Sequence, residues 1–186
     1  MTSLITRKLT MLAAASAMTF ALGAPVFAAG SDSGDAPAAT ETTTKCKDGK
    51  VWDKDKKECV DPQKSGFNDT DLYNAARELA YAGQYDNAIA MLRVASNQND
   101  PRILNYMGFA NRKAGRVDLA MRYYNKAIAA DANYLLARSY MGQGLVLQGK
   151  IEEARAQLIE IRDRGGRDTY AYRALYQALK HGSTYY

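Results

Sequence analysis

The two cysteines, Cys46 and Cys59, are the residues whose type and spacing predict chemistry most directly. Their spacing is wider than the C-x-x-C of redox enzymes, and no histidine or second cysteine pair lies nearby to complete a zinc-type ligand set. In an exported chain with two cysteines, only one intramolecular pairing exists. Because the leader described below predicts export, we expect a disulfide bond between Cys46 and Cys59.

The sequence offers little for catalysis. Its single histidine, His181, precedes Gly182 at the end of the last predicted helix, where the helix dipole stabilises a cation. The adjacent acids Glu152 and Glu153 open a predicted helix, where they favour its N-terminus. There is no G-x-S-x-G motif, no phosphate-binding loop and no H-E-x-x-H motif. We therefore predict a protein that is not an enzyme and that needs neither a metal nor a cofactor.

A small β-hairpin linked by the disulfide is predicted at residues 45–64. The dipeptide Asp48-Gly49 is typical of a hairpin turn, and residues 50–52 alternate in the way that a short strand does. This segment has few apolar residues with which to build a core. A disulfide that closes a loop of about 14 residues stabilises a fold by about 3 kcal/mol, because it restricts the unfolded chain.

Trp52 is the residue of this hairpin with a candidate binding role. The segment that begins at Cys46 has the pattern C-x-x-G-x-x-W-D, which is similar to a hairpin found in small chitin-binding modules. That resemblance implies that the Trp52 ring would stack on a sugar face, as in a cell-wall glycan such as peptidoglycan. The alternative is that Trp52 only covers the disulfide bond.

The first 28 residues have the features of a secretory signal peptide. Two basic residues precede an apolar stretch at residues 9–24, and small residues before Ala29 suit a signal peptidase. We expect cleavage between Ala28 and Ala29. The apolar stretch is shorter than the about 20 residues that span a bilayer, so a stable membrane anchor is not expected. The leader resembles those of bacteria, which makes the periplasm the expected destination.

A linker is predicted at residues 29–44. This stretch is built from Ser, Asp, Gly, Ala, Pro and Thr and has no apolar periodicity. Such a composition cannot bury enough apolar surface to offset the entropy of ordering, so we expect the linker to be disordered.

Three imperfect repeats follow the hairpin, at residues 69–100, 101–134 and 135–166. Each repeat has two amphipathic helical segments separated by a glycine, and a further helix is expected at 168–181. The glycines that separate the segments are Gly83, Gly115 and Gly149. A period of about 34 residues is typical of helix pairs that stack and bury their apolar faces against one another.

These repeats resemble tetratricopeptide repeats. The resemblance rests on small residues at positions where paired helices approach closely: Ala76, Gly108 and Gly142 on the first helices, and Ala88, Ala120 and Ala154 on the second. It implies an all-α fold, a right-handed superhelical stack of three helix pairs with a C-terminal capping helix, preceded by the hairpin. The segment LNYMGFANRKAGRVDLAMRYYNKAIA also resembles small exported repeat proteins of alphaproteobacteria.

In the family that these repeats resemble, the first helix of each pair lines a concave groove that binds peptides. The positions that correspond to the groove in the first two repeats hold five basic or amide side chains and three aromatic ones: Tyr73, Arg77, Tyr81, Arg102, Asn105, Phe109, Arg112 and Lys113. The resemblance implies that these residues bind a peptide or protein segment. Arginines beside aromatic rings favour a partner that carries acidic residues.

The composition bounds the function further. The formal net charge of +5 is spread as mixed signs along the helices, and no basic tract carries interleaved aromatics, so nucleic acid is not an expected partner. We predict a periplasmic scaffold that binds a protein or peptide segment. Two alternatives stay open, namely a cell-wall glycan binder that uses Trp52 and a non-catalytic subunit of an envelope enzyme complex.

Overall fold

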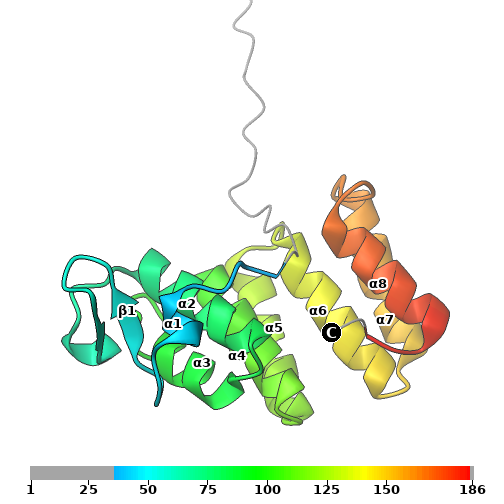
Figure 1. Ribbon diagram of the computed structural model, residues 1–186. Coiled ribbons are helices and arrows are strands. Elements are labelled where there is room, and N and C mark those ends of the chain that lie inside the picture. Colours follow the sequence, from blue (N-terminus) through cyan, green and yellow to red (C-terminus); the bar gives the residue numbers. More distant parts are fainter. Residues whose placement is uncertain (1–35, 185–186) are drawn as a thin grey trace, which may run out of the picture.

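The computed structural model describes residues 36–184 of the chain (Figure 1). The predicted signal peptide, its cleavage site at Ala28 and Ala29, and residues 29–35 of the predicted linker lie outside the described residues. No helix in the described range has both the length and the apolar character needed to cross a membrane.

The described chain is mostly helical, with one small antiparallel hairpin near its N-terminal end. Helices that are consecutive in the sequence pack as pairs, α2 with α3, α4 with α5, and α6 with α7, and α8 packs on α6 and α7. Figure 1 shows the pairs following one another across the molecule. Their bounds are α2 Asp69–Tyr81, α3 Tyr85–Leu92, α4 Pro101–Lys113, α5 Val117–Ala130, α6 Leu135–Leu147, α7 Ile151–Asp163 and α8 Tyr170–His181.

The turn inside each pair is the same in all three repeats. Gly83, Gly115 and Gly149 have φ angles of 78°, 81° and 73°, a left-handed conformation that glycine adopts without a steric cost. The backbone N–H after each glycine donates to a carbonyl five residues earlier, as in the bond of 2.8 Å from Arg116 to Asn111. This bond satisfies a carbonyl that the end of the helix would otherwise leave unpaired.

Small residues lie where the helices of the stack pack closely, as the sequence predicted. Ala88, Ala120 and Ala154 on the second helices are completely buried. A Cβ atom added at Gly108 would lie 2.5 Å from the Tyr124 ring, and one added at Gly142 would lie 2.5 Å from the Leu175 side chain of α8. Neither glycine therefore leaves room for any side chain. Gly108 faces the partner helix of its own pair, as expected, whereas Gly142 faces α8.

The hairpin is present, but its connecting loop lies elsewhere than predicted. Strands β1 (Val51–Asp53) and β2 (Glu58–Val60) pair antiparallel, and residues 54–57 connect them. The Asp53 carboxylate accepts the backbone N–H groups of Asp55 and Lys56, both at 3.0 Å, which fixes the loop and lowers the pKa of Asp53. The Asp48-Gly49 turn does form, at φ angles of 55° and 72°, but it lies before β1.

The disulfide between Cys46 and Cys59 is confirmed, with an S–S distance of 2.08 Å. It ties β2 to the segment that follows a short helix, α1 (Glu41–Thr44), while a 3-10 turn at Pro62–Lys64 leads toward α2.

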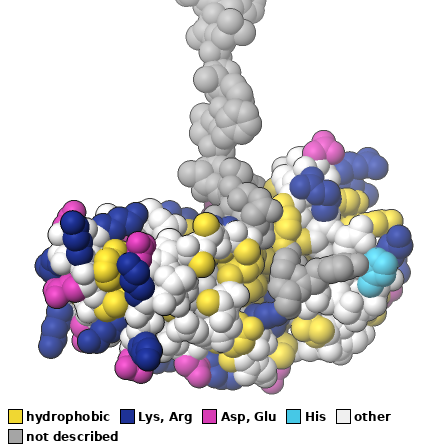
Figure 2. Space-filling view, viewed as in Figure 1, with side chains coloured by type: hydrophobic (Ala, Val, Ile, Leu, Met, Phe, Trp, Pro, Cys, Tyr) yellow, Lys and Arg dark blue, Asp and Glu magenta, His cyan; other side chains and the backbone are white. Residues whose placement is uncertain are grey.

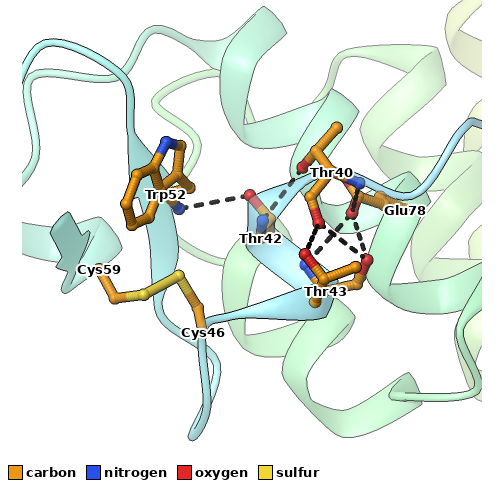
Figure 3. The surroundings of a disulfide bond; sticks show 8 residues. Thr40, Thr42, Thr43, Cys46, Trp52, Cys59 and Glu78 are labelled. Carbon is orange, nitrogen blue, oxygen red and sulfur yellow. Dashed lines mark hydrogen bonds between the residues drawn. A yellow bond between two sulfur atoms is a disulfide. The ribbon is translucent and has the colours of Figure 1, made fainter. Parts of the chain in front are cut away.

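The prediction of a disordered linker is wrong over the part of it that the structure describes. Thr40 caps α1, and both Thr40 and Thr43 bind the carboxylate of Glu78 on α2 (Figure 3). Glu78 accepts four hydrogen bonds of 2.5 to 3.2 Å from these two residues. The sequence composition missed this anchor because the order comes from hydrogen bonds to a distant buried acid and not from apolar burial.

Candidate functional site

Side chains from α2, α4 and α6 meet in a cluster of aromatic rings and arginines. We call it the aromatic-arginine cluster and define it by the residues in mutual contact: Tyr73, Arg77, Tyr81, Arg102, Tyr106, Phe109, Arg112 and Tyr140. It contains six of the eight side chains that the sequence assigned to the groove.

The rings of the cluster bridge the three helices. Phe109 on α4 lies 5.5 Å from the Tyr81 ring of α2 and 5.1 Å from the Tyr140 ring of α6, measured between centroids. The hydroxyl groups of Tyr81 and Tyr140 are 3.2 Å apart, so one hydrogen bond joins the first and third helix pairs. Tyr73 meets Tyr106 edge to face at 5.3 Å. Such ring pairs stabilise beyond their buried area by about 0.5 to 1.5 kcal/mol each.

Each arginine of the cluster lies against a ring. Arg77 donates to the Tyr106 hydroxyl at 2.9 Å and its guanidinium lies 5.7 Å from the Tyr81 ring. Arg102 lies 5.2 Å from the Tyr73 ring and pairs with Asp100 at 2.7 Å, which raises the pKa of Arg102. Arg102 is thus already engaged with an acid of its own chain.

The prediction that all eight groove residues would be exposed to a partner is wrong for four of them. Tyr73, Asn105, Phe109 and Arg112 are all at most 4% exposed. They are buried because the rings and guanidinium groups of three helices pack on one another instead of lining an open channel. Arg77, Tyr81 and Arg102 are half-buried and form the accessible edge of the cluster, and Lys113, which follows Arg112, is also half-buried.

Arg112 is the group of the cluster whose hydrogen bonding is incomplete. Its Nε donates to the Tyr124 hydroxyl at 3.3 Å, but its buried Nη2 has no hydrogen-bond partner in the described part of the chain. A buried charged donor without a partner is costly. Next to it, burial first and the charge of Arg112 second lower the pKa of Lys113. Two neighbouring cations, one of them deeply buried, favour the approach of an anion.

Two buried amides near the cluster also keep an atom without a partner. Asn105 donates from Nδ2 to the Tyr134 hydroxyl at 3.3 Å, and Gln143 donates from Nε2 to the Ser139 hydroxyl at 3.3 Å. Their oxygens, Oδ1 and Oε1, are buried without a hydrogen-bond partner among the described residues. Gly144, the residue after Gln143, borders Arg112. A Cβ atom added at Gly144 would lie 3.4 Å from the Cδ of Arg112.

A concave region lies between the hairpin and α2, and we call it the hairpin cleft. Its volume is about 750 Å³, and its lining includes Trp52, Phe67, Asp71, Asn74 and Arg77. Because Arg77 also belongs to the aromatic-arginine cluster, the two regions are neighbours on α2.

Trp52 is half-buried at this cleft, and Cys59 is its cross-strand partner. Lys45 places its Nζ 4.8 Å from the centroid of the indole ring. The ring therefore lies beside the disulfide, as one of the two interpretations held, while it also lines the cleft, as the other requires.

Charged side chains do not form a single patch on the face drawn in Figure 2, where Lys and Arg gather at the hairpin end with Asp and Glu among them. Within residues 36–184, no group of three or more His, Cys, Asp or Glu side chains is arranged to hold a metal ion.

Three contributors to the candidate site were missed or undervalued from the sequence. Glu78 was not singled out, although an acid between the buried Ala76 and Leu79 is an unusual position that signals a specific partner. Gln143 was not singled out either, and Tyr140 was not recognised as the link to α2. Their importance depends on side-chain contacts across repeats, which no local pattern encodes.

Comparisons of the chain with protein-family models, with curated proteins and with solved structures found no match. The function of the protein must therefore be inferred from the geometry of the aromatic-arginine cluster and the hairpin cleft.

Proposed function

We propose that this protein is an exported interaction scaffold of the tetratricopeptide type, which binds an acidic segment of a partner protein at the aromatic-arginine cluster. The repeated helix pairs support the family assignment, because each closes with a left-handed glycine and the small residues expected at helix contacts are buried. A disulfide is typical of proteins from oxidising compartments, which supports export to the periplasm.

The two neighbouring cations at the end of α4 are the observation that carries the proposal. The guanidinium of Arg112 is only 4% exposed and its Nη2 has no hydrogen-bond partner among the described residues, so its charge is poorly compensated next to the half-buried Lys113. A carboxylate of a partner at Lys113 is attracted by both charges and stabilises the protonated form of Lys113. Tyr81 and Arg77 at the edge of the cluster offer a ring and a cation to neighbouring side chains of the same partner.

Charge reversal at the edge of the cluster tests this proposal. Lys113 is half-buried next to Arg112 of the cluster, and Lys113→Glu reverses its charge. Lys126 lies on the exposed side of α5, and Lys126→Glu is the matched control. Arg112 itself is unsuitable, because a buried charge reversal would unfold the protein. The wild type and the two variants are each used to capture proteins from an envelope extract at 0.1 M salt. Mass spectrometry then quantifies how much of each captured protein binds to the wild type and to each variant.

We expect Lys113→Glu to weaken capture of the specific partner about tenfold or more, and Lys126→Glu to leave it within twofold. The loss should shrink as salt rises, because the screening length falls from about 10 Å at 0.1 M to about 3 Å at 1 M. Equal capture by both variants would refute the cluster as the binding site.

The hairpin cleft supports a second candidate function, the binding of a cell-wall glycan. The cleft is lined by the Trp52 ring, the carboxylate of Asp71 and the amide of Asn74, which are the kinds of stacking and hydrogen-bonding groups that a sugar ring requires. Trp52 is the only tryptophan, so its fluorescence reports on the cleft directly. Titration with soluble peptidoglycan fragments should shift this emission if the cleft binds glycan, and Asp71→Asn should weaken the response. An unchanged emission at millimolar fragment would exclude this function.

A further inference from the structure

The hairpin cleft and the accessible edge of the aromatic-arginine cluster are joined along one side of α2. Four side chains at spacings of three and four residues lie on this side of the helix: Asp71, Asn74, Arg77 and Tyr81. The first three line the cleft, and the last two belong to the cluster, where the Arg77 guanidinium lies 5.7 Å from the Tyr81 ring. Asp71 and Asn74 are exposed and the other two are half-buried, so a partner can reach all four.

The same surface continues from Tyr81 to Lys113. Helices α2 and α4 run in the same direction, because their ring contacts occur in the same order along both helices. The Tyr81 ring stacks on Phe109, and Lys113 follows Phe109 by one turn, about 6 Å along α4. From Asp71 to Tyr81 the surface extends about 15 Å along α2. Its whole length is therefore about 20 Å, which about six residues of an extended peptide span.

The two ends of this surface differ in chemistry. At the cleft end, the half-buried rings of Trp52 and Phe67 line a volume of about 750 Å³, which leaves room for a further ring. These rings favour an aromatic side chain of the partner, whose peptide N–H groups can donate to the exposed Asp71 carboxylate. At the other end, Lys113 lies next to Arg112, and the two cations favour a carboxylate.

We propose that one extended segment of the partner protein occupies both regions, with an acidic residue at Lys113 and an aromatic residue in the hairpin cleft, about six residues apart. This inference rests on the proposed function of the cluster and adds a second contact for the same partner. It also gives the hairpin a role, because the hairpin supplies the Trp52 ring that selects the aromatic residue. A glycan in the cleft would compete with this partner instead of binding beside it.

Fluorescence of Trp52, the only tryptophan, reports on occupation of the cleft and tests the inference. The probes are tryptophan-free peptides of about 12 residues, selected from a random display library on the full mature chain because Lys113→Glu abolishes their binding. Each probe is also made with its acidic residue, or each aromatic residue in turn, changed to alanine. Affinity is measured by fluorescence anisotropy of the labelled probe, and Trp52 emission is recorded at saturation with the unlabelled probe.

We expect a saturating probe to shift the Trp52 emission. Changing one aromatic residue, about six positions from the acidic residue, should remove this shift and weaken binding about tenfold. Changing the acidic residue should weaken binding by a similar factor and leave the shift at saturation intact, because the aromatic residue still enters the cleft.

Asn74→Arg tests the surface between the two ends. Asn74 is exposed, so the variant should fold, and the larger side chain should obstruct the cleft that Asn74 lines. We expect this variant to bind the probe about tenfold more weakly, with no further loss for the probe whose aromatic residue is already alanine. Asn125→Arg, at an exposed position of α5, is the matched control and should leave binding within twofold.

The possible failures are distinguishable. If probes that depend on Lys113 saturate the protein without shifting the Trp52 emission, the partner does not enter the cleft, and the inference is wrong while the proposed function stands. The same conclusion follows if peptidoglycan fragments still shift the emission while a probe is bound, because the cleft then holds a glycan beside the partner. If the library yields no probe that depends on Lys113, the proposed function itself fails.

Discussion

The N-terminal unit at residues 36–64 and the helical stack at residues 69–181 are stabilised in opposite ways. In the unit, strands of three residues pack little apolar surface, with Cys46, Val51 and Pro62 as its buried apolar residues. Its order depends on a covalent bond and on the hydrogen bonds that Glu78 accepts. In the stack, rings, leucines and alanines form a buried cluster that runs continuously from α2 to α6.

This difference determines how each region responds to change. Close packing penalises any added volume but tolerates loss of a single polar contact, whereas a small unit without a core depends on each specific bond. The candidate binding groups lie in the stack, where rigid helices hold them in place. The N-terminal unit is attached to this scaffold through the hydrogen bonds to Glu78 and through Val51, which packs in the buried cluster of the stack.

The largest effect is expected from Gly108→Leu in the stack. The added side chain would begin 2.5 Å from the Tyr124 ring, and overpacking of this kind costs about 3 kcal/mol or more. Thermal melting should show a fall of roughly 10 °C. Gly66→Leu is the matched control, because a Cβ there meets nothing within 4 Å. Equal melting temperatures for the two variants would contradict the close packing assigned to the stack.

Removal of the disulfide should affect the unit and spare the stack. Replacing both Cys46 and Cys59 by alanine removes about 3 kcal/mol of loop restriction. Amide hydrogen exchange at residues 46–60 should accelerate by roughly 100-fold, while exchange in α4 and α5 and the helical circular dichroism stay unchanged. If the variant lost helix content as well, the two regions would be one cooperative unit.

The next largest effect is expected from Glu78→Gln. Glu78 lies in α2 of the stack, but its carboxylate binds the N-terminal unit, so this change tests the link between the two regions. The amide oxygen can keep the three bonds that Oε1 accepts, but the amide nitrogen cannot accept the bond that the Thr40 hydroxyl donates to Oε2, and the negative charge is lost, so the contact should lose about 2 kcal/mol. Hydrogen exchange should rise at residues 40–46 without a large change in melting temperature. Glu58→Gln, at an exposed strand position, should change neither quantity.

The smallest effect concerns pH. Burial would raise the pKa of Asp100, but hydrogen bonds from the side chain and backbone of Arg102 outweigh it and lower the pKa. The carboxylate therefore stabilises the stack above the pKa of an unfolded aspartate, near 3.9, and this contribution is lost as the pH falls below it. The melting temperature should fall more steeply below about pH 4 in the wild type than in Asp100→Asn, which keeps the helix cap. If the melting temperatures of the wild type and Asp100→Asn fell in parallel with pH, ionisation of Asp100 would not contribute to the stability of the stack.

The sequence was informative where structure depends on local patterns. The glycine turns and the buried alanines of the second helices follow from spacing within or between neighbouring helices, and because they repeat, each copy supports the others. The pairing of the cysteines follows from the presence of only two of them in the sequence.

The sequence was less informative where structure depends on contacts between distant residues. Asp53 caps the hairpin loop, and this hydrogen bonding sets the position of the loop in spite of the turn dipeptide upstream. Glu78 orders a segment whose own composition predicts disorder. Burial of Phe109 and Arg112 results from rings supplied by α2 and α6, so helical periodicity alone assigned them to an open groove.

Site-specific photo-crosslinking tests the central claim most directly, because it compares the two regions in one experiment. A benzoylphenylalanine is placed at Tyr81 in the aromatic-arginine cluster, at Trp52 in the hairpin cleft, or at Tyr123 on α5 as a control, in cells that express the full chain. We predict one dominant protein adduct from Tyr81, lost when Lys113→Glu is added, and none from Tyr123. An adduct that forms from Trp52 and not from Tyr81 would show that the hairpin binds the partner and would contradict the account.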